Sequence, residues 1–214
     1  MIDTTWGYKL TTANSLTDFL TVQEFNTFTA NKFTGDVRIE SNIKSATRSI
    51  QNYCGWHIYP NLECEMVYRV LDLRDCFVGR DLLIQLPSTY VTEVTSILIN
   101  AKQEGGIWIG DLTTDFDFEK SGILRVYDVD NIDRRSKIRI VFKSGLDASQ
   151  IDILKELTAN RVTHAVSSTY GVMSEAAGGV SVSYNASWAG NTRSTALPDD
   201  NKEILNAYRV KGVF

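Results

Sequence analysis

The sequence predicts an α+β fold: a small helical bundle with an inserted antiparallel β block and an extended C-terminal tail ending in a short helix. Apolar residues recur every three or four positions over residues 39–54 and 148–170, which is the period of an amphipathic helix. Between residues 61 and 145 the period falls to two, which is typical of strands. The expected parts are the arm with the first two helices (1–60), the inserted β block (61–146), the long helix that completes the bundle (147–172) and the tail (173–214).

The composition is that of an ordinary folded protein, with 43% hydrophobic and 22% charged residues among 214, so a packed core is expected. The formal net charge is -4 and the basic residues are scattered. The densest basic stretch, residues 134–139, is flanked by Asp128, Asp130 and Asp133, which would cancel most of the field that a phosphate backbone meets. Binding of nucleic acid through a basic surface is therefore not expected.

The cysteines and the N-terminus indicate where the chain folds. Cys54, Cys64 and Cys76 are far apart and odd in number, which argues against a disulfide framework or a zinc site and fits a reducing cytoplasm. Residues 1–6 contain no basic region followed by an apolar run, and no later window is long and apolar enough to cross a bilayer. We therefore expect a protein that is neither exported nor embedded in a membrane.

The first helix begins near Leu20. Thr21 can cap its free amides, Glu24 can complete a capping box, and Leu20 can pack on Phe25. This helix must end before Gly35.

The second helix starts near Asp36 and carries a clear apolar face. Gly55 supplies its left-handed stop, and an aromatic exit with Trp56 and Pro60 cannot continue it. The apolar face comprises Ile39, Ile43, Ala46, Ile50, Tyr53 and Cys54.

Branched and aromatic residues at alternate positions predict several short antiparallel strands after the second helix. They are expected around Met66–Leu71, Leu82–Leu86, Val94–Ile99, Ile107–Ile109, Ile123–Tyr127 and Ile138–Phe142. The breaks between them fall at Asp81, Pro87, Gly105, Gly106, Gly122 and Gly145.

The last long helix is expected from about residue 148 to 170, opened by Asp147 or Ser149 and ended by Gly171. The tail then runs through a stretch rich in small polar residues to a terminal helix that Asp200 and Glu203 cap. This helix is too short to be stable alone in water, so it needs a docking surface, and another chain is one candidate. Its narrow apolar edge comprises Ile204, Leu205 and Tyr208.

No residues combine into a catalytic site or a cofactor site. The two histidines, His57 and His164, have no serine or cysteine nucleophile motif beside them. The stretch 128–133 begins like a calcium loop but lacks the glycine at its sixth position. Gly105, Gly106 and Gly110 do not form a phosphate-binding motif, so we expect no metal and no cofactor.

An acidic run offers the strongest alternative to this non-catalytic interpretation. Asp115, Asp117 and Glu119 alternate with two phenylalanines, so their carboxylates share one face of a strand. Such residues can form the carboxylate pair of a carbohydrate-active enzyme or a calcium site. A half-buried strand with a solvated acidic face explains the same pattern without a ligand, and we favour it.

In their order and spacing, these segments resemble the head-tail adaptor (connector) proteins of long-tailed bacteriophages. The resemblance covers about residues 18 to 210 and departs from the family pattern at Trp56, where the family often has arginine, and in a long strand block. The segments that carry it are Ile39–Ile58 with Tyr53-Cys54-Gly55-Trp56, Leu86-Pro87, Val91–Ile97, Glu119–Leu124, Ile138–Gly145 and Ser174–Tyr184.

The resemblance implies a virion structural protein, assembled in the host cytoplasm, that acts in DNA packaging and ejection. Many copies, expected to be twelve, would form a ring under the portal protein, extend the DNA channel and offer a docking surface to stopper or tail-completion proteins. Viral DNA would pass without sequence-specific binding, which suits an acidic chain. The portal or subunit interface would be the C-terminal segment, with Pro198, Ile204, Leu205, Tyr208, Val210 and Phe214 as candidates.

Two alternatives remain at this point. A stopper or tail-terminator subunit of a phage also needs a β-rich body and ring symmetry. A small carbohydrate-active enzyme would use the acidic run Asp115, Asp117 and Glu119.

Overall fold

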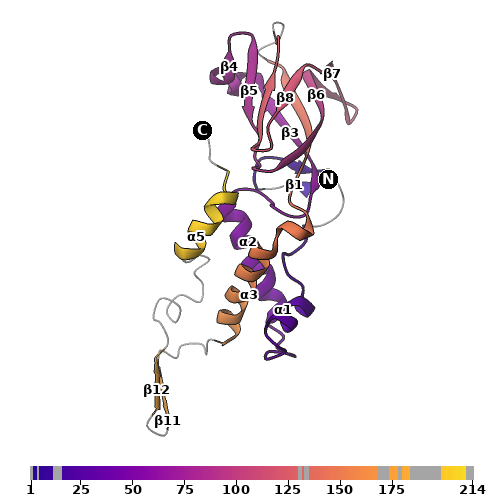
Figure 1. Cartoon of the computed structure of the whole chain (residues 1–214). Coiled ribbons are helices and arrows are strands. Elements are labelled where there is room, and N and C mark those ends of the chain that lie inside the picture. Colours follow the sequence, from indigo (N-terminus) through magenta and orange to yellow (C-terminus); the bar gives the residue numbers. More distant parts are fainter. Residues whose placement is uncertain are drawn as a thin grey trace. The chain divides into compact units, whose positions relative to one another are not determined.

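The computed structural model describes residues 2–3, 5–11, 16–129, 132, 135–167, 174–177, 180–183 and 199–210 (Figure 1). It combines helices with antiparallel sheets, so the predicted α+β class is confirmed. The chain divides into two compact units, each built from separate stretches. The sheet unit comprises Met1–Thr17, Cys54–Ala148 and Ala207–Phe214, and the helical unit comprises Asp18–Tyr53 and Ser149–Asn206.

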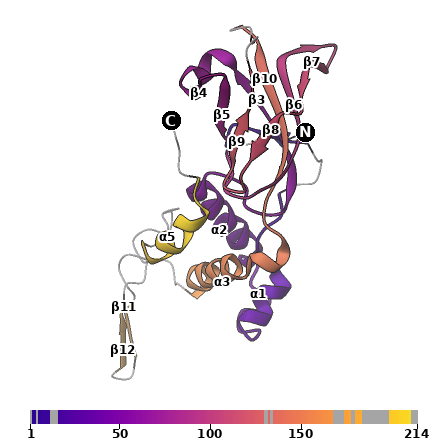
Figure 2. The ribbon, with the colours of Figure 1, turned by 45° about the horizontal axis from the view of Figure 1, so that its top comes forward.

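The sheet unit contains a six-stranded and a four-stranded sheet (Figure 2). The six-stranded sheet has the order β1 (Ile2–Asp3), β2 (Lys9–Leu10), β3 (Leu62–Arg69), β10 (Lys137–Ser144), β6 (Val91–Glu104) and β7 (Ile107–Thr113). The four-stranded sheet has the order β4 (Phe77–Val78), β5 (Asp81–Gln85), β9 (Ile123–Val126) and β8 (Phe116–Phe118). β7 and β4 are therefore edge strands of different sheets.

Alternation of apolar and polar residues gives the strands of the sheet unit one buried face. In β5, Leu82 and Ile84 are buried while Leu83 between them is exposed, whereas in the central strand β10 Val141 is buried together with its neighbours Ile140 and Phe142. Buried side chains of both sheets belong to one apolar core. Each contributes roughly 1.5–3 kcal/mol through burial, so the shared core holds the two sheets together.

The helical unit contains four α-helices among its described residues. They are α1 (Val22–Phe28), α2 (Ile39–Cys54), α3 (Asp152–Ser167) and α5 (Asp199–Leu205), and a hairpin of β11 (Ser174–Ala177) and β12 (Val180–Ser183) lies between α3 and α5 in the sequence. Helices α1, α2 and α3 share an apolar core. This core comprises Leu20, Phe25, Ile39, Ile43, Ala46, Ala159, Val162 and Val166.

Local signals in the sequence fix the ends of the first two helices. Thr21 accepts a hydrogen bond from the Glu24 backbone N–H, and the Glu24 carboxylate accepts one from the Thr21 backbone N–H, so the predicted capping box is confirmed. Helix α2 ends at Cys54, and Gly55 follows at φ 81°, in the left-handed region that favours glycine. The predicted stop is therefore confirmed.

The structure corrects two predicted elements. The strand expected through Leu71 ends at Arg69, and Val70–Cys76 forms a 3-10 helix instead (η1). The helix expected from residue 148 begins at Asp152, after a single 3-10 turn over Ala148–Gln150. The first difference falls at the short apolar run Val70-Leu71, which fits either period, so tertiary packing decides the conformation. The second is a 3-10 turn of the kind that commonly precedes an α-helix.

Candidate partner-binding surfaces

The structure places the six candidate interface residues in different environments. Pro198 and Phe214 lie outside the described residues. Leu205, the last residue of α5, has an exposed fraction of 0%, whereas Ile204 beside it is 39% exposed. Tyr208 and Val210 are half-buried. The predicted apolar edge of the terminal helix is therefore not one exposed surface. Leu205 packs inside this chain, whereas Ile204 faces outward.

Residues of the sheet unit hold the end of the described chain. The Trp56 indole Nε1 donates a hydrogen bond to the Tyr208 carbonyl oxygen at 2.6 Å, and the Thr89 hydroxyl donates to the same oxygen at 3.4 Å. The Val210 N–H donates to the Cys54 carbonyl oxygen at 3.0 Å. Trp56 is fully buried, and a buried indole N–H needs such a partner. These contacts fix residues 208–210 to the exit of α2.

Sequence reasoning identified Trp56 as a departure from the family pattern but missed its role. The available signal was a large aromatic residue with a polar N–H directly after the glycine stop of a helix. Such a side chain can be buried only with an acceptor, and the sequence does not show that Tyr208, 152 positions away, supplies it.

Within the helical unit, polar contacts join segments that are distant in sequence. The Tyr53 hydroxyl donates to Asn206 Oδ1 at 2.9 Å, which ties α2 to the residue after α5. Lys155 Nζ donates to Glu24 Oε1 at 2.6 Å, which joins α3 to α1. That hydrogen bond lowers the pKa of Glu24.

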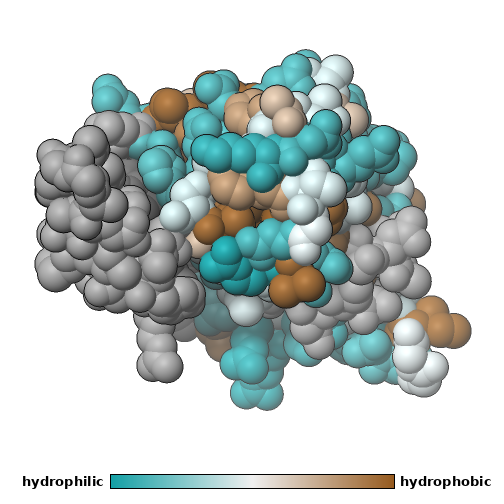
Figure 3. All heavy atoms as spheres, turned by 90° about the horizontal axis from the view of Figure 1, so that it is seen from below, coloured by the Kyte–Doolittle hydropathy of each residue, from teal (hydrophilic) through white to brown (hydrophobic). Residues whose placement is uncertain are grey.

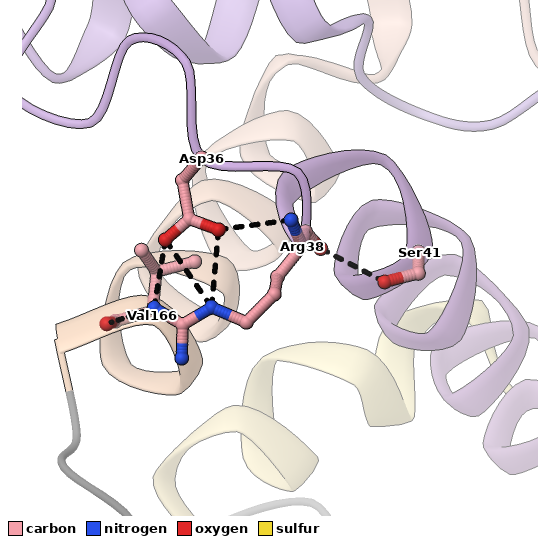
Figure 4. A network of polar contacts seen from close by, with 4 residues as sticks. All are labelled: Asp36, Arg38, Ser41 and Val166. Atoms are coloured by element: carbon pink, nitrogen blue, oxygen red, sulfur yellow. Dashed lines mark hydrogen bonds and ion pairs between the residues drawn. The ribbon is translucent and has the colours of Figure 1, made fainter.

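A third polar network fixes the start of α2 to the end of α3 (Figure 4). The Asp36 carboxylate accepts from the Arg38 backbone N–H at 2.9 Å and from Arg38 Nη2 at 2.7 Å. The same Nη2 donates to the Val166 carbonyl oxygen at 3.1 Å, near the C-terminal end of α3. Hydrogen bonding to Arg38 lowers the pKa of Asp36 to about 2, so this carboxylate stays charged near neutral pH.

His57 is locked into a structural network. Its Nδ1 lies 2.7 Å from the Tyr8 hydroxyl, and its Nε2 lies 2.9 Å from the Ser144 carbonyl oxygen and 3.1 Å from that of Pro60. Nε2 therefore carries the proton, and Nδ1 accepts from Tyr8. Burial lowers the pKa of His57 to about 4 and raises that of Tyr8. Both ring nitrogens are engaged, so the imidazole joins three segments and has no position for a substrate.

The acidic run has ordinary surface partners. Asp117 accepts from the Tyr127 hydroxyl at 2.8 Å, and Glu119 accepts from the Ser121 hydroxyl at 3.0 Å. Asp115, Asp117 and Glu119 are all exposed. In the part of the chain that the structure describes, no group of three or more His, Cys, Asp or Glu side chains is placed to hold a metal ion. The geometry supports a solvated acidic face.

Comparison with known families decides the identity. The family model described as head completion protein (HCP) matches residues 18–210, which is most of the chain. The chain belongs to the head completion protein family. The resemblance to head-tail connector proteins is thereby confirmed, and the protein is a component of a bacteriophage-type virion.

This head completion protein is also similar to a solved structure over most of its length. A solved chain described as "Neck of empty GTA particle computed with C6 symmetry" is similar at 15% sequence identity with a TM-score of 0.49. The similarity covers 90% of this chain and 97% of that chain. No curated protein matches the sequence significantly.

Both units of this head completion protein expose large apolar side chains. Figure 3 views the protein from below relative to Figure 1 and shows apolar residues among polar ones on that face. The exposed apolar residues of the helical unit include Val22, Phe28, Val37 and Ile153. Those of the sheet unit include Leu71, Val78, Leu83, Ile107, Ile109 and Leu112. Among the described residues, no helix is long and apolar enough to cross a membrane. Exposed apolar side chains mark a binding surface only where they gather into a patch.

Proposed function

We propose that this head completion protein is the adaptor of a head-tail connector. Several copies, expected to be twelve, form a ring under the portal protein, continue the DNA channel and present a docking surface to stopper or tail-completion proteins. The observation that carries the proposal is the family match over residues 18–210. In this arrangement, the helical unit is a small bundle, and the β block of residues 61–146 is an insertion into it. The role is structural and involves no catalysis.

The charge of the chain supports a conduit for DNA. With a formal net charge of -4 and scattered basic residues, the protein lacks the basic stripe that grips a phosphate backbone. A ring of such subunits repels DNA weakly and so lets it slide. Viral DNA therefore passes without sequence-specific binding.

The C-terminal segment is the proposed contact with the portal protein. Ile204 is exposed on α5, and Tyr208 and Val210 are half-buried where the sheet unit holds them. Pro198 and Phe214 complete the candidate set. Leu205 supports this surface from inside, because it is fully buried in this chain.

The direct test mixes the purified protein with the portal protein of the same virus and examines the product by electron microscopy. We expect a ring of copies attached to one face of the portal, with a continuous central channel. Protein that stays monomeric and ignores portals across a wide concentration range would contradict the proposal. Attachment to tail tubes instead of portals would favour a stopper or tail-terminator subunit.

The enzyme alternative has a separate test. Replacing Asp115, Asp117 and Glu119 together by alanine leaves portal attachment unchanged under the proposed function, because all three are exposed. A polysaccharide-hydrolysing activity that this triple variant loses would argue for the carbohydrate-active enzyme.

A further inference from the structure

Basic side chains gather on the outer face of the six-stranded sheet, where β3, β10 and β6 lie side by side (Figure 2). Lys137 at the start of β10 lies directly opposite Arg69 at the end of β3, so both side chains stand on the same face. Arg139 is two residues further along β10 and shares that face. Ile138 between them is fully buried in the core. The three cations are therefore on the face turned away from the core.

Arg69 and Lys137 form a repulsive pair that the described chain does not neutralise. Like charges directly opposite each other on neighbouring strands destabilise a sheet. Both side chains are exposed, and neither has a carboxylate partner among the described residues. Lys143 at the other end of β10 differs, because its Nζ lies 2.7 Å from Glu93 Oε2. A protein keeps such a cost where function requires it, and a negative group of another molecule would remove the cost here.

This cluster is not the basic stretch that the sequence shows at residues 134–139. Alternation along β10 selects two residues of that stretch, and the third cation comes from β3. The aspartates flanking the stretch were expected to cancel its field. Asp128 lies 4.0 Å from Arg80 Nη1, whereas Asp130 and Asp133 lie outside the described residues. The cluster therefore depends on strand pairing, which the sequence alone does not reveal.

Trp108 and Glu65 hold the cluster in a defined arrangement. Beyond a bulge at Asn100, β6 pairs with the part of β7 that carries Trp108, and this ring is half-buried. Lys137 Nζ and Arg139 Cζ each lie 5.9 Å from the ring centroid. Arg139 Nη2 is also 2.6 Å from Oε2 of buried Glu65. Since these cations are already held in place, binding of an anion costs less conformational entropy. We call Arg69, Lys137, Arg139 and Trp108 the basic corner.

An exposed apolar side chain adjoins the basic corner. Leu112 is 64% exposed and lies on the same face of β7 as Trp108. The register places Leu112 opposite Leu98 of β6, and Leu98 opposite Arg139 of β10. A row across three strands thus runs from an apolar group to a cation. A ligand that fits here carries negative charge and an apolar group close together.

These properties fit an acidic protein segment better than DNA. Carboxylates form charge-assisted hydrogen bonds with arginine and lysine, and an apolar side chain of the same segment can cover Leu112. A protein that binds DNA through roughly 6–10 phosphates needs an extended basic surface. The scattered basic residues of this chain, with its net charge of -4, provide no such surface beyond the corner.

The acidic run of this chain is a weaker counterpart than a foreign segment. Asp117 stands directly opposite Arg125 of β9 and accepts from the Tyr127 hydroxyl at 2.8 Å. Glu119 accepts from the Ser121 hydroxyl at 3.0 Å. These carboxylates already have partners within the chain, so a second copy would exchange existing contacts instead of adding new ones.

We propose that the basic corner binds an acidic segment of a different protein in the virion. Carboxylates of that segment pair with Arg69 and Lys137, and a neighbouring apolar side chain covers Leu112. The observation that carries the inference is the cross-strand pair of cations that no described carboxylate neutralises. The inference depends on incorporation into a virion, which follows from the family, and not on the adaptor role.

The stability of the free chain tests whether the corner is uncompensated. Arg69→Gln removes one charge of the repulsive pair, so we expect the urea concentration at the unfolding midpoint to stay the same or rise. Lys143→Gln is the matched control on the same face, and it should lower the midpoint slightly because it breaks the pair with Glu93. A larger fall for Arg69→Gln than for Lys143→Gln would mean that the chain itself neutralises Arg69, and would overturn the proposal.

Photo-cross-linking identifies the bound segment in assembled particles. Benzoylphenylalanine replaces Leu112, whose exposure makes the substitution compatible with folding. Mass spectrometry of irradiated virions should reveal a link to a different virion protein, in a segment with Asp or Glu beside the linked residue. The same replacement at Leu83, which is 42% exposed on the other sheet, is the control and should not give that link.

Charge reversal then measures the contribution of the corner to the affinity for the linked protein. Lys137→Glu should weaken binding of that purified protein at least about tenfold. Lys143→Glu, on the same strand and face, should change the affinity by less than about twofold. Circular dichroism verifies the folding of each variant. Equal losses from both variants would assign the binding to net charge and contradict the basic corner.

The remaining outcomes separate this inference from the proposed function. A link to nucleic acid, to a second copy or to a segment without carboxylates overturns the inference, as does the absence of any link at Leu112. If portal protein binds normally while Leu112 gives no link, the inference fails and the adaptor function stands. If Leu112 links to an acidic segment while the chain binds no portal protein, the inference stands and the proposed function fails.

Discussion

Trp56 and Tyr208 are joined by a 2.6 Å hydrogen bond from the indole Nε1 to the backbone carbonyl oxygen. The bond links the exit of α2 to the end of the described chain, and it depends on a side chain that the family resemblance marked as atypical. It makes the C-terminal segment part of the folded sheet unit up to Val210, whose N–H donates to Cys54. If this segment is the proposed contact with the portal protein, the folded sheet unit holds it in place up to Val210.

Trp56→Phe tests this bond directly. Phenylalanine keeps most of the buried apolar surface but removes the donor, so the Tyr208 carbonyl keeps only the 3.4 Å contact from Thr89. We expect a loss of about 1–2 kcal/mol in the free energy of unfolding, measured by urea denaturation. Thr89→Ala is the control and should cost less, because its contact is long. Equal losses from the two variants would contradict a larger contribution from the indole N–H than from the Thr89 hydroxyl.

Acidification should destabilise the protein through His57. Its folded pKa of about 4 lies below the ordinary 6.5, so the unfolded state binds more protons between these values. The stabilising contribution of the neutral imidazole is complete above pH 6.5 and is lost as pH falls towards 4. The shift corresponds to about 3 kcal/mol. Asp36, with a pKa lowered to about 2, adds a further loss only below about pH 4.

Urea titrations at pH 7, 5.5 and 4.5 measure this dependence. At pH 7, His57→Gln should have a lower free energy of unfolding than the unmodified protein. Between pH 7 and 4.5, that free energy should decrease much less than in the unmodified protein. His164→Gln is the matched control, because His164 is exposed on α3, and it should keep the full dependence. A His57→Gln variant with an unchanged pH profile would assign the effect to other groups.

Substitutions of the adjacent residues Ile204 and Leu205 should affect different properties. Substitution of Ile204 should weaken portal attachment, and substitution of Leu205 should lower stability. Ile204→Glu changes an exposed side chain, so we expect a stability change within about 0.5 kcal/mol and weaker attachment to portal protein. Leu205→Ala leaves a cavity and should cost about 2–5 kcal/mol. Thermal unfolding and a portal pull-down distinguish the two effects. Normal attachment of Ile204→Glu would remove Ile204 from the proposed interface.

Asp36→Asn should loosen the start of α2. The substitution removes the charge that binds Arg38 and so weakens the link from Arg38 to the Val166 carbonyl oxygen. We expect faster hydrogen exchange at the first amides of α2 and the last turn of α3, measured by mass spectrometry. Asp72→Asn, at an exposed position of the sheet unit, is the control and should leave both regions unchanged. Unchanged exchange in Asp36→Asn would mean that apolar packing alone fixes these helix ends.

Features encoded by neighbouring residues could be predicted from the sequence. The capping box of Thr21 and Glu24 and the stop at Gly55 depend on residues within one helical turn, and both are present. The 3-10 helix at Val70–Cys76 was not predicted, because the short apolar run Val70-Leu71 fits more than one period. The start of α3 was placed too early, because a 3-10 turn precedes the helix and the apolar pattern does not distinguish the two.

Features made by residues distant in sequence could not be predicted. The acceptor for Trp56 and the Asn100 bulge arise from pairs whose meeting the topology decides. For the same reason, the environments of the candidate interface residues could not be predicted. The apolar edge of the terminal helix was visible as a pattern, but its division into buried Leu205 and exposed Ile204 depends on tertiary packing.

The alternation of the chain between its two units has a consequence for biosynthesis. The sheet unit takes its segments from both ends and the middle of the sequence, and the helical unit takes Asp18–Tyr53 and Ser149–Asn206 from between them. A ribosome releases the N-terminus first, so the helical unit is incomplete until Asn206 has been synthesised and the sheet unit until the stretch from Ala207 has been. A product that ends before Asn206 therefore lacks part of both units, so premature release leaves two incomplete folding units and not one finished unit.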